Sequence, residues 1–175
     1  MTEWINSIRA DLDHAERLDA DLEYFAANYL KIRPKTGALE PLVFNAAQRE
    51  LHRRLEEQKA KTGKVRAVVL KARQLGISTY IGGRFFKRTI QCPGLRTIII
   101  AHEKPASNNL YKMVRRFCGH MSLEVRPSIG TDNAQELIFD KIDSGYAVTV
   151  ATEEGAGRSD TAQMQHASEA SRWVR

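Results

Sequence analysis

The sequence predicts an α/β fold in which helices alternate with the strands of a largely parallel sheet. Two short runs are nearly all apolar, as expected for strands that are buried on both faces of such a sheet; they lie at residues 66–70 (RAVVL) and 96–101 (RTIIIA). A segment with helical character follows each run, at 78–89 and at 105–118. This strand–helix–strand–helix order implies right-handed crossovers and therefore an α/β sheet.

The composition is that of an ordinary globular domain. With 175 residues, 42% of them hydrophobic and 27% charged, the chain is long enough for one domain with a substantial core. A net charge of +6 fits a polyanionic partner, although such an excess also occurs on proteins that bind no nucleic acid. Cys92 and Cys118 lack metal-site spacing, and no apolar run approaches the roughly 18 residues needed to span a bilayer. We expect a cytoplasmic protein without membrane contact.

The N-terminal region is predicted to be one long amphipathic helix over residues 2–30, capped by Thr2. Pro34 and Gly37 end this pattern. We therefore divide the chain into an N-terminal helical segment, 1–37, and a main domain, 38–175.

The main domain opens with a helix that Asn45 caps and that runs to about Ala60. Gln48 stands at the third helical position, as in a capping box. Farther along the chain, the pattern predicts a β-hairpin from residues 135–140 and 146–150. Residues 161–167 have the outline of one more strand, although it is unusually polar.

A polar box, K-A-R-Q-L-G-I-S-T, occupies residues 71–79 between the first predicted strand and its helix. Free amide groups at a helix start after a tight turn form an anion site, and phosphate is the expected anion in an α/β protein. The usual phosphate loop reads G-x-x-x-x-G-K-[ST]. Here Ile77 fills the lysine slot and Lys71 fills the slot of the first glycine, so the positive charge lies upstream, at Lys71 and Arg73.

The pattern K-x-R-Q-x-G-x-S-T resembles the deviant Walker A box of phage large terminase subunits, which are ATP-driven DNA-packaging motors. The resemblance covers roughly Pro41 to Trp173. It implies a P-loop NTPase fold of the ASCE type, a three-layer sandwich whose mostly parallel sheet carries a β-hairpin. It also implies ATP and Mg²⁺ as cofactors.

By this resemblance the nucleotide site consists of Lys71, Arg73, Gln74, Gly76, Ile77, Ser78 and Thr79, with Gln48 reading the adenine edge. Ser78 takes the position of the metal ligand, and Thr79 is the alternative hydroxyl. Either Lys71 or Arg73 reads the β- and γ-phosphates; the planar fork of Arg73 favours it. Each of the two cations has the alternative role of a structural ion-pair partner.

The sequence S-E-A-S-R-W at 168–173 resembles the S-E-x-A-x-W end of the terminase Walker B strand, with Ser171 where the family more often has alanine. The resemblance makes Glu169 the base that activates water and Ser168 part of the Mg²⁺ shell; the alternative is a surface glutamate. Arg158, which follows Gly155-Ala156-Gly157, corresponds to an arginine that acts on the neighbouring subunit's nucleotide. The alternatives for Arg158 are a contact with DNA phosphate and a merely solvated side chain.

We therefore expect the ATP-hydrolysing front portion of a DNA-packaging motor, truncated before the nuclease domain. The partners implied by resemblance are double-stranded DNA, further copies of the chain in a ring, the small terminase subunit and the portal. One alternative is a catalytically incomplete nucleotide- or DNA-binding fragment, such as a prophage remnant. Another is a helicase-like DNA translocase, against which the S-E sequence argues because such enzymes carry D-E-x-H.

Overall fold

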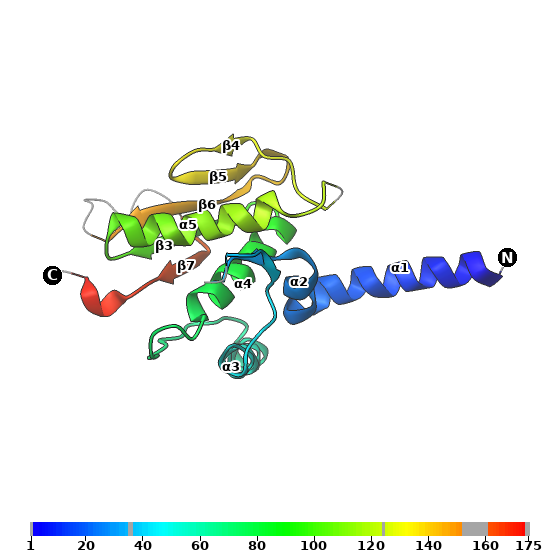
Figure 1. Cartoon of the computed structure of the whole chain (residues 1–175), viewed down its shortest axis with the longest axis horizontal. Coiled ribbons are helices and arrows are strands. Elements are labelled where there is room, and N and C mark those ends of the chain that lie inside the picture. The colour runs from blue at the N-terminus through cyan, green and yellow to red at the C-terminus, as the bar shows by residue number, and fades with distance from the viewer. Residues whose placement is uncertain (1, 35–36, 124, 152–160, 174–175) are drawn as a thin grey trace.

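The computed structural model describes residues 2–34, 37–123, 125–151 and 161–173 and has an α/β fold (Figure 1). The helices are α1 (Thr2–Ala20), α2 (Leu22–Tyr29), α3 (Ala46–Thr62), α4 (Ile77–Gln91) and α5 (Lys104–Gly119), with 3₁₀ turns η1 (Asp140–Ile142) and η2 (Ala170–Arg172). The strands are β1 (Lys31–Ile32), β2 (Glu40–Pro41), β3 (Arg96–Ala101), β4 (Thr131–Asp132), β5 (Glu136–Phe139), β6 (Ser144–Val150) and β7 (Met164–Ala167).

The main sheet has five strands in the order β4-β5-β6-β3-β7. β3 is parallel to both β6 and β7, whereas β5 is antiparallel to β4 and to β6. The predicted hairpin is thus confirmed as β5 and β6, and the polar strand as β7. The sheet is mixed rather than mostly parallel, because β4 and β5 fold back antiparallel at one edge. β1 and β2 form a separate two-stranded ladder.

Residues 66–70, predicted to be a buried strand, form no strand in the structure. Val68 and Leu70 are 102% and 101% exposed. The side chain of Gln58 takes the place of a neighbouring strand at Arg66: Gln58 Nε2 donates to the Arg66 carbonyl at 2.9 Å, and the Arg66 amide donates to Gln58 Oε1 at 3.0 Å. The prediction failed because β-propensity alone does not form a strand. A strand also needs a neighbouring strand to hydrogen-bond with, and without one the backbone of this segment stays solvated and its side chains do not pack on a sheet.

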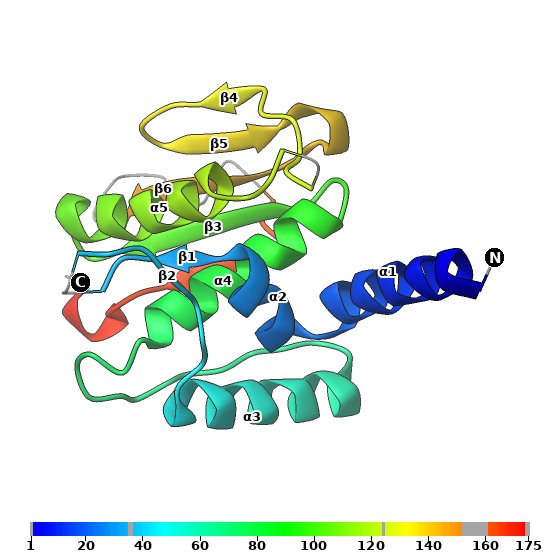
Figure 2. The ribbon, with the colours of Figure 1, turned by 45° about the vertical axis from the view of Figure 1, so that its right-hand side comes forward.

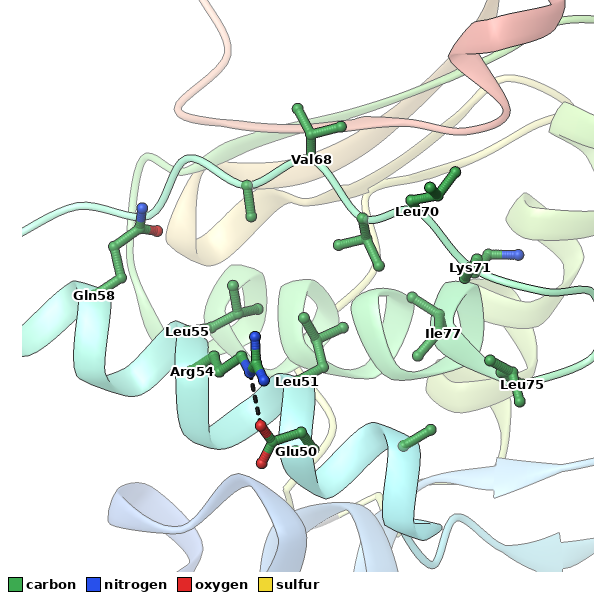
Figure 3. Close-up of a pocket in the computed structure, with 13 residues that line it drawn as sticks. Glu50, Leu51, Arg54, Leu55, Gln58, Val68, Leu70, Lys71, Leu75 and Ile77 are labelled. Atoms are coloured by element: carbon green, nitrogen blue, oxygen red, sulfur yellow. Dashed lines mark hydrogen bonds and ion pairs between the residues drawn. The ribbon is translucent and has the colours of Figure 1, made fainter.

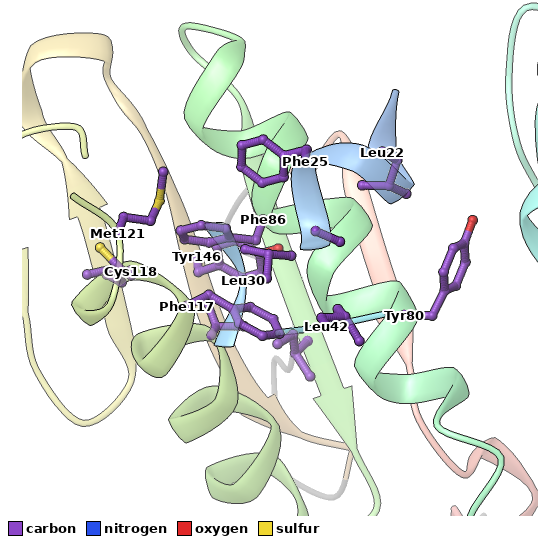
Figure 4. Packing of buried hydrophobic residues seen from close by; sticks show 14 of the residues in the cluster. Leu22, Phe25, Leu30, Leu42, Tyr80, Phe86, Phe117, Cys118, Met121 and Tyr146 are labelled. Atoms are coloured by element: carbon purple, nitrogen blue, oxygen red, sulfur yellow. The ribbon is translucent and has the colours of Figure 1, made fainter. Parts of the chain in front are cut away.

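The core lies between α4, α5 and one face of the sheet (Figure 4). Phe86 of α4 packs against Phe117 of α5 and Phe139 of β5, with ring centroids 5.8 and 6.5 Å apart. The hydroxyl of Tyr146 on β6 reaches the carbonyl of Gly82 on α4, at 3.4 Å. Both helices therefore cover the same face, so the described part of the chain forms no three-layer sandwich with helices on both faces.

The N-terminal helix predicted over 2–30 is divided at Asp21, which caps α2 by accepting a hydrogen bond from the Tyr24 amide at 3.0 Å. α1 extends away from the body of the molecule, whereas α2 packs against it (Figure 2). Phe25 and Leu30 are 4% and 0% exposed and belong to the same core cluster as Phe86. The N-terminal segment and the main domain therefore share one hydrophobic core.

Candidate functional site

A cavity of about 240 Å³ lies between the extended segment 65–71 and the edge strand β7. Five of the residues singled out from the sequence line it: Lys71, Ile77, Ser78, Ser168 and Glu169. The first three come from the polar box and the last two from the end of β7. The tertiary structure thus brings together two stretches that are distant in the chain.

Ser78 reaches this cavity because α4 begins directly after Gly76. Gly76 adopts the left-handed conformation, with φ of +69°, and a Cβ there would lie 2.7 Å from Nε2 of Gln48. Both facts require glycine at this position. No side chain caps the helix, and its first helical hydrogen bond runs from the Tyr80 amide to the Gly76 carbonyl. The amides of the first turn therefore have no partner within the helix, as an anion site requires.

Gln48 holds the turn that precedes α4. The capping box is confirmed: the Asn45 side chain accepts from the Gln48 amide at 3.0 Å, and Gln48 Oε1 accepts from the Asn45 amide at 2.9 Å. Gln48 Nε2 also donates to the Gly76 carbonyl at 2.8 Å, and Asn45 Nδ2 to the Leu75 carbonyl at 3.2 Å. The Gln48 side chain is 3% exposed and engaged at both ends of its amide. It is not among the residues that line the cavity, so its contact with adenine stays a prediction.

The two candidate phosphate-reading cations lie in different surroundings. Both are exposed, but only Lys71 lines the cavity together with Ser78 and Glu169; Arg73 is not among the lining residues. Burial, and to a lesser degree the positive charge of Lys71, lowers the pKa of the neighbouring His166 to about 4. His166 is therefore neutral at pH 7, and Lys71 is the cation that this geometry places at the site.

Glu169 lies two residues past the end of β7 and has φ of +52°. Its Oε2 atom is 3.4 Å from Nε of Arg172 and 3.5 Å from Nδ1 of His102. His102 directly follows β3, which is paired in parallel with β7. His102 was not singled out from the sequence. A signal for it exists, since His102 is a polar residue directly after a buried strand, and the carboxyl ends of adjacent parallel strands meet at one edge of the sheet.

A larger cavity, of about 510 Å³, lies between segment 67–71 and α3 (Figure 3). Its walls include apolar side chains of α3 and the ion pair between Glu50 Oε1 and Arg54 Nε, at 2.6 Å. Hydrogen bonds from Arg53 and Arg54 lower the pKa of Glu50 to about 2. Ala67, Val69 and Lys71 line both cavities, so the two cavities adjoin at this segment.

The remaining sequence-predicted residues lie elsewhere. Gln74 is exposed, with φ of +66°, and Thr79 is half-buried in the first turn of α4; neither is among the residues that line the smaller cavity. Arg158 lies outside the described residues. Across the part of the chain that the structure describes, no three His, Cys, Asp or Glu side chains gather as a metal site would require. In the same part, every helix is too short or too polar to cross a membrane.

The fold and the site together define an α/β protein with a candidate anion site at the carboxyl edge of its sheet, between a helix start and an edge strand. No protein-family model matches the chain, and a search of curated proteins finds no relative that matches it.

Proposed function

We propose that this protein binds and hydrolyses ATP as the ATPase portion of a DNA-packaging motor of the large-terminase kind. One observation carries the proposal: Lys71 and Ser78, from the polar box, line the same cavity as Ser168 and Glu169, from the end of β7. ATP hydrolysis needs a phosphate cradle, a metal ion, positive charge and a carboxylate that activates water. This group of side chains contains a residue suited to each of those tasks.

The phosphate cradle is the start of α4, where the amides that follow Gly76 have no helical partner. A triphosphate at this point gains the attraction of the helix dipole, which contributes about 0.3–1 kcal/mol in an exposed setting. Lys71 is a basic side chain that lines the same cavity. Lys71 rather than Arg73 is therefore our phosphate-reading residue.

The oxygen donors around the cavity suit magnesium, which prefers oxygen ligands and keeps several waters. Ser78 and Ser168 supply hydroxyl groups for this purpose. Bound there, Mg²⁺ would neutralise charge on the transferred phosphoryl group. Glu169 would accept the proton of the attacking water.

The charge distribution supports a polyanionic partner. Residues 58–102 contain ten lysines and arginines and no aspartate or glutamate. Such a concentration of positive charge suits the phosphate backbone of double-stranded DNA. By resemblance to terminases, further copies of the chain in a ring, a small terminase subunit and a portal would be the protein partners.

Steady-state release of phosphate from Mg-ATP tests hydrolysis. We expect the Glu169→Gln variant to lose most of the activity while it still binds ATP, because the amide cannot accept a proton. Equal rates in both proteins would contradict the role of Glu169 as base.

Binding of ATP tests the cradle. Lys71→Ala should weaken binding, and Arg73→Ala is the matched control because it removes an equal charge two residues away without touching the cavity. Equal losses in both variants would point to general electrostatic attraction and contradict a site built on Lys71.

Nucleotide or DNA binding without hydrolysis is the second candidate function. The observation that favours it is the unpaired segment 66–70, which leaves Lys71 without a strand to fix its position. ATP binding that depends on Lys71, combined with no phosphate release above the level of Glu169→Gln, would select this function over the first.

A further inference from the structure

We propose that His102 is a positioning residue that holds the carboxylate of Glu169 in place for catalysis. This inference rests on the proposed function, because Glu169 has a catalytic carboxylate to be positioned only if the protein hydrolyses ATP.

The register of the sheet fixes this pairing. β3 and β7 run parallel, with Ile100 opposite Ala167, and the Ser168 amide continues the ladder by donating to the Ile100 carbonyl at 2.8 Å. His102 and Glu169 each lie two residues beyond that last register pair. Two adjacent strands therefore deliver the imidazole and the carboxylate to the same edge of the sheet.

The surroundings of His102 favour a role directed at Glu169. Its side chain is 12% exposed, and its Nδ1 atom is fully enclosed without a hydrogen bond among the described residues. Oε2 of Glu169 lies 3.5 Å from this Nδ1 atom, which is within ion-pair distance but too long for a good hydrogen bond. An enclosed polar nitrogen without a partner is costly, so a small rotation of the carboxylate that completes this bond is favoured.

The opposite side of the ring faces a second carboxylate. Nε2 of His102 lies 3.3 Å from Oε1 of Glu103, and Glu103 is itself largely exposed. With Nε2 directed at Glu103, the ring presents Nδ1 to Glu169. Arg172, at 3.4 Å from the same Oε2 atom, contacts Glu169 from η2. His102 is thus the enclosed member, and Arg172 the exposed member, of a pair that holds one carboxylate oxygen and leaves the other for water.

Two substitutions that introduce the same amide group at different positions test the role of Nδ1. His102→Asn places an amide donor close to the position of Nδ1, whereas His102→Gln places it close to Nε2. We expect His102→Asn to retain kcat for phosphate release and His102→Gln and His102→Ala to lose roughly 10- to 100-fold in kcat, with unchanged affinity for ATP. Equal activity of the Asn and Ala variants would overturn the proposal, as would a loss that appears only in ATP affinity.

A double variant separates this inference from the proposed function. In the Glu169→Gln background, His102→Ala should cause no further loss of kcat, because the group it positions is gone. If Glu169→Gln is fully active, the proposed function fails. If Glu169→Gln is inactive and His102→Ala is fully active, the proposed function stands and the positioning role is overturned.

The contact itself can be measured without activity. Long-range ¹H–¹⁵N NMR of the free protein should show a proton on Nδ1 of His102, and the Nδ1 resonance should move in the Glu169→Gln variant. The exposed His120 provides an internal reference that should not move. An Nδ1 resonance that is identical in both proteins would overturn the proposal even where a His102 variant fails to fold.

Discussion

The side chain of Gln48 bonds the carbonyl of Gly76 at 2.8 Å and thereby ties the start of α3 to the start of α4. Its other amide atom closes the capping box with Asn45. One buried amide thus fixes the turn that aims the first amides of α4 at the cavity.

Gln48→Glu should therefore destabilise the fold. The carboxylate keeps an acceptor for the Asn45 amide but faces the Gly76 carbonyl with a second acceptor, so we expect a loss of about 1–3 kcal/mol in the free energy of unfolding. Urea denaturation measures it. Gln58→Glu is the control, because Gln58 makes the same two-way pairing with Arg66 at an exposed site, and its loss should be smaller. Equal losses would contradict the importance of burial at Gln48.

Leu70→Ala should change the free energy of unfolding by less than about 0.5 kcal/mol, because the side chain is fully exposed. Leu137→Ala on β5 removes the same atoms from a side chain that is 1% exposed and should cost about 2–5 kcal/mol. Chemical denaturation of both variants compares them directly. A loss above 2 kcal/mol for Leu70→Ala would show that residues 66–70 are buried in solution, as the sequence pattern predicts.

Gly145→Ala should destabilise the sheet. A Cβ at this position on β6 would lie 2.7 Å from the carbonyl oxygen of Leu137 and 3.3 Å from Cα of Ile138, and neither backbone atom can move aside cheaply. We expect a loss of about 1–3 kcal/mol. At Gly119, the last residue of α5, a Cβ would meet nothing within 4 Å. Gly119→Ala should therefore cost nothing and gain up to about 1 kcal/mol; thermal unfolding that ranks the two variants in reverse would refute this account.

Stability should fall as the pH drops below about 6.5, in part because of His52. Burial lowers the pKa of His52 below its ordinary value of 6.5, although Glu56 opposes the shift. The unfolded chain then binds a proton at a higher pH than the folded protein, so this contribution is fully present above pH 6.5 and is lost as the pH falls through the folded-state pKa. His52→Gln should flatten the slope of stability against pH in that window. An unchanged slope in His52→Gln would exclude His52 as the cause.

The two thiols should differ in reactivity at pH 8. Burial raises the pKa of Cys118 to about 11, so roughly one molecule in a thousand carries the thiolate there, and the side chain is 2% exposed. Cys92 is only half-buried. A thiol reagent such as DTNB should label one cysteine quickly and the second only on unfolding. Cys92→Ser should abolish the fast phase; if the fast phase survives, Cys118 is the accessible thiol.

Much of the fold was predictable because it depends on local patterns. The capping box at Asn45 and Gln48, the helix that follows the polar box and the hairpin of β5 and β6 all show in spacing and residue type. The break between α1 and α2 at Asp21 is also a local feature. It was not predicted because the apolar residues keep their helical spacing on both sides of Asp21. The order of the strands is not a local property, because pairing depends on partners that lie far away in the chain.

By itself the sequence determined where most of the helices and strands lie and which polar stretches are candidates for a binding site. Only the tertiary structure decided which of them meet. It placed Lys71 rather than Arg73 beside Ser78 and Glu169, added His102, and left residues 66–70 outside the sheet. The physical reason is that a local pattern states what a segment prefers, whereas burial and hydrogen bonding are settled between segments, and a strand-like segment without a neighbour remains exposed chain.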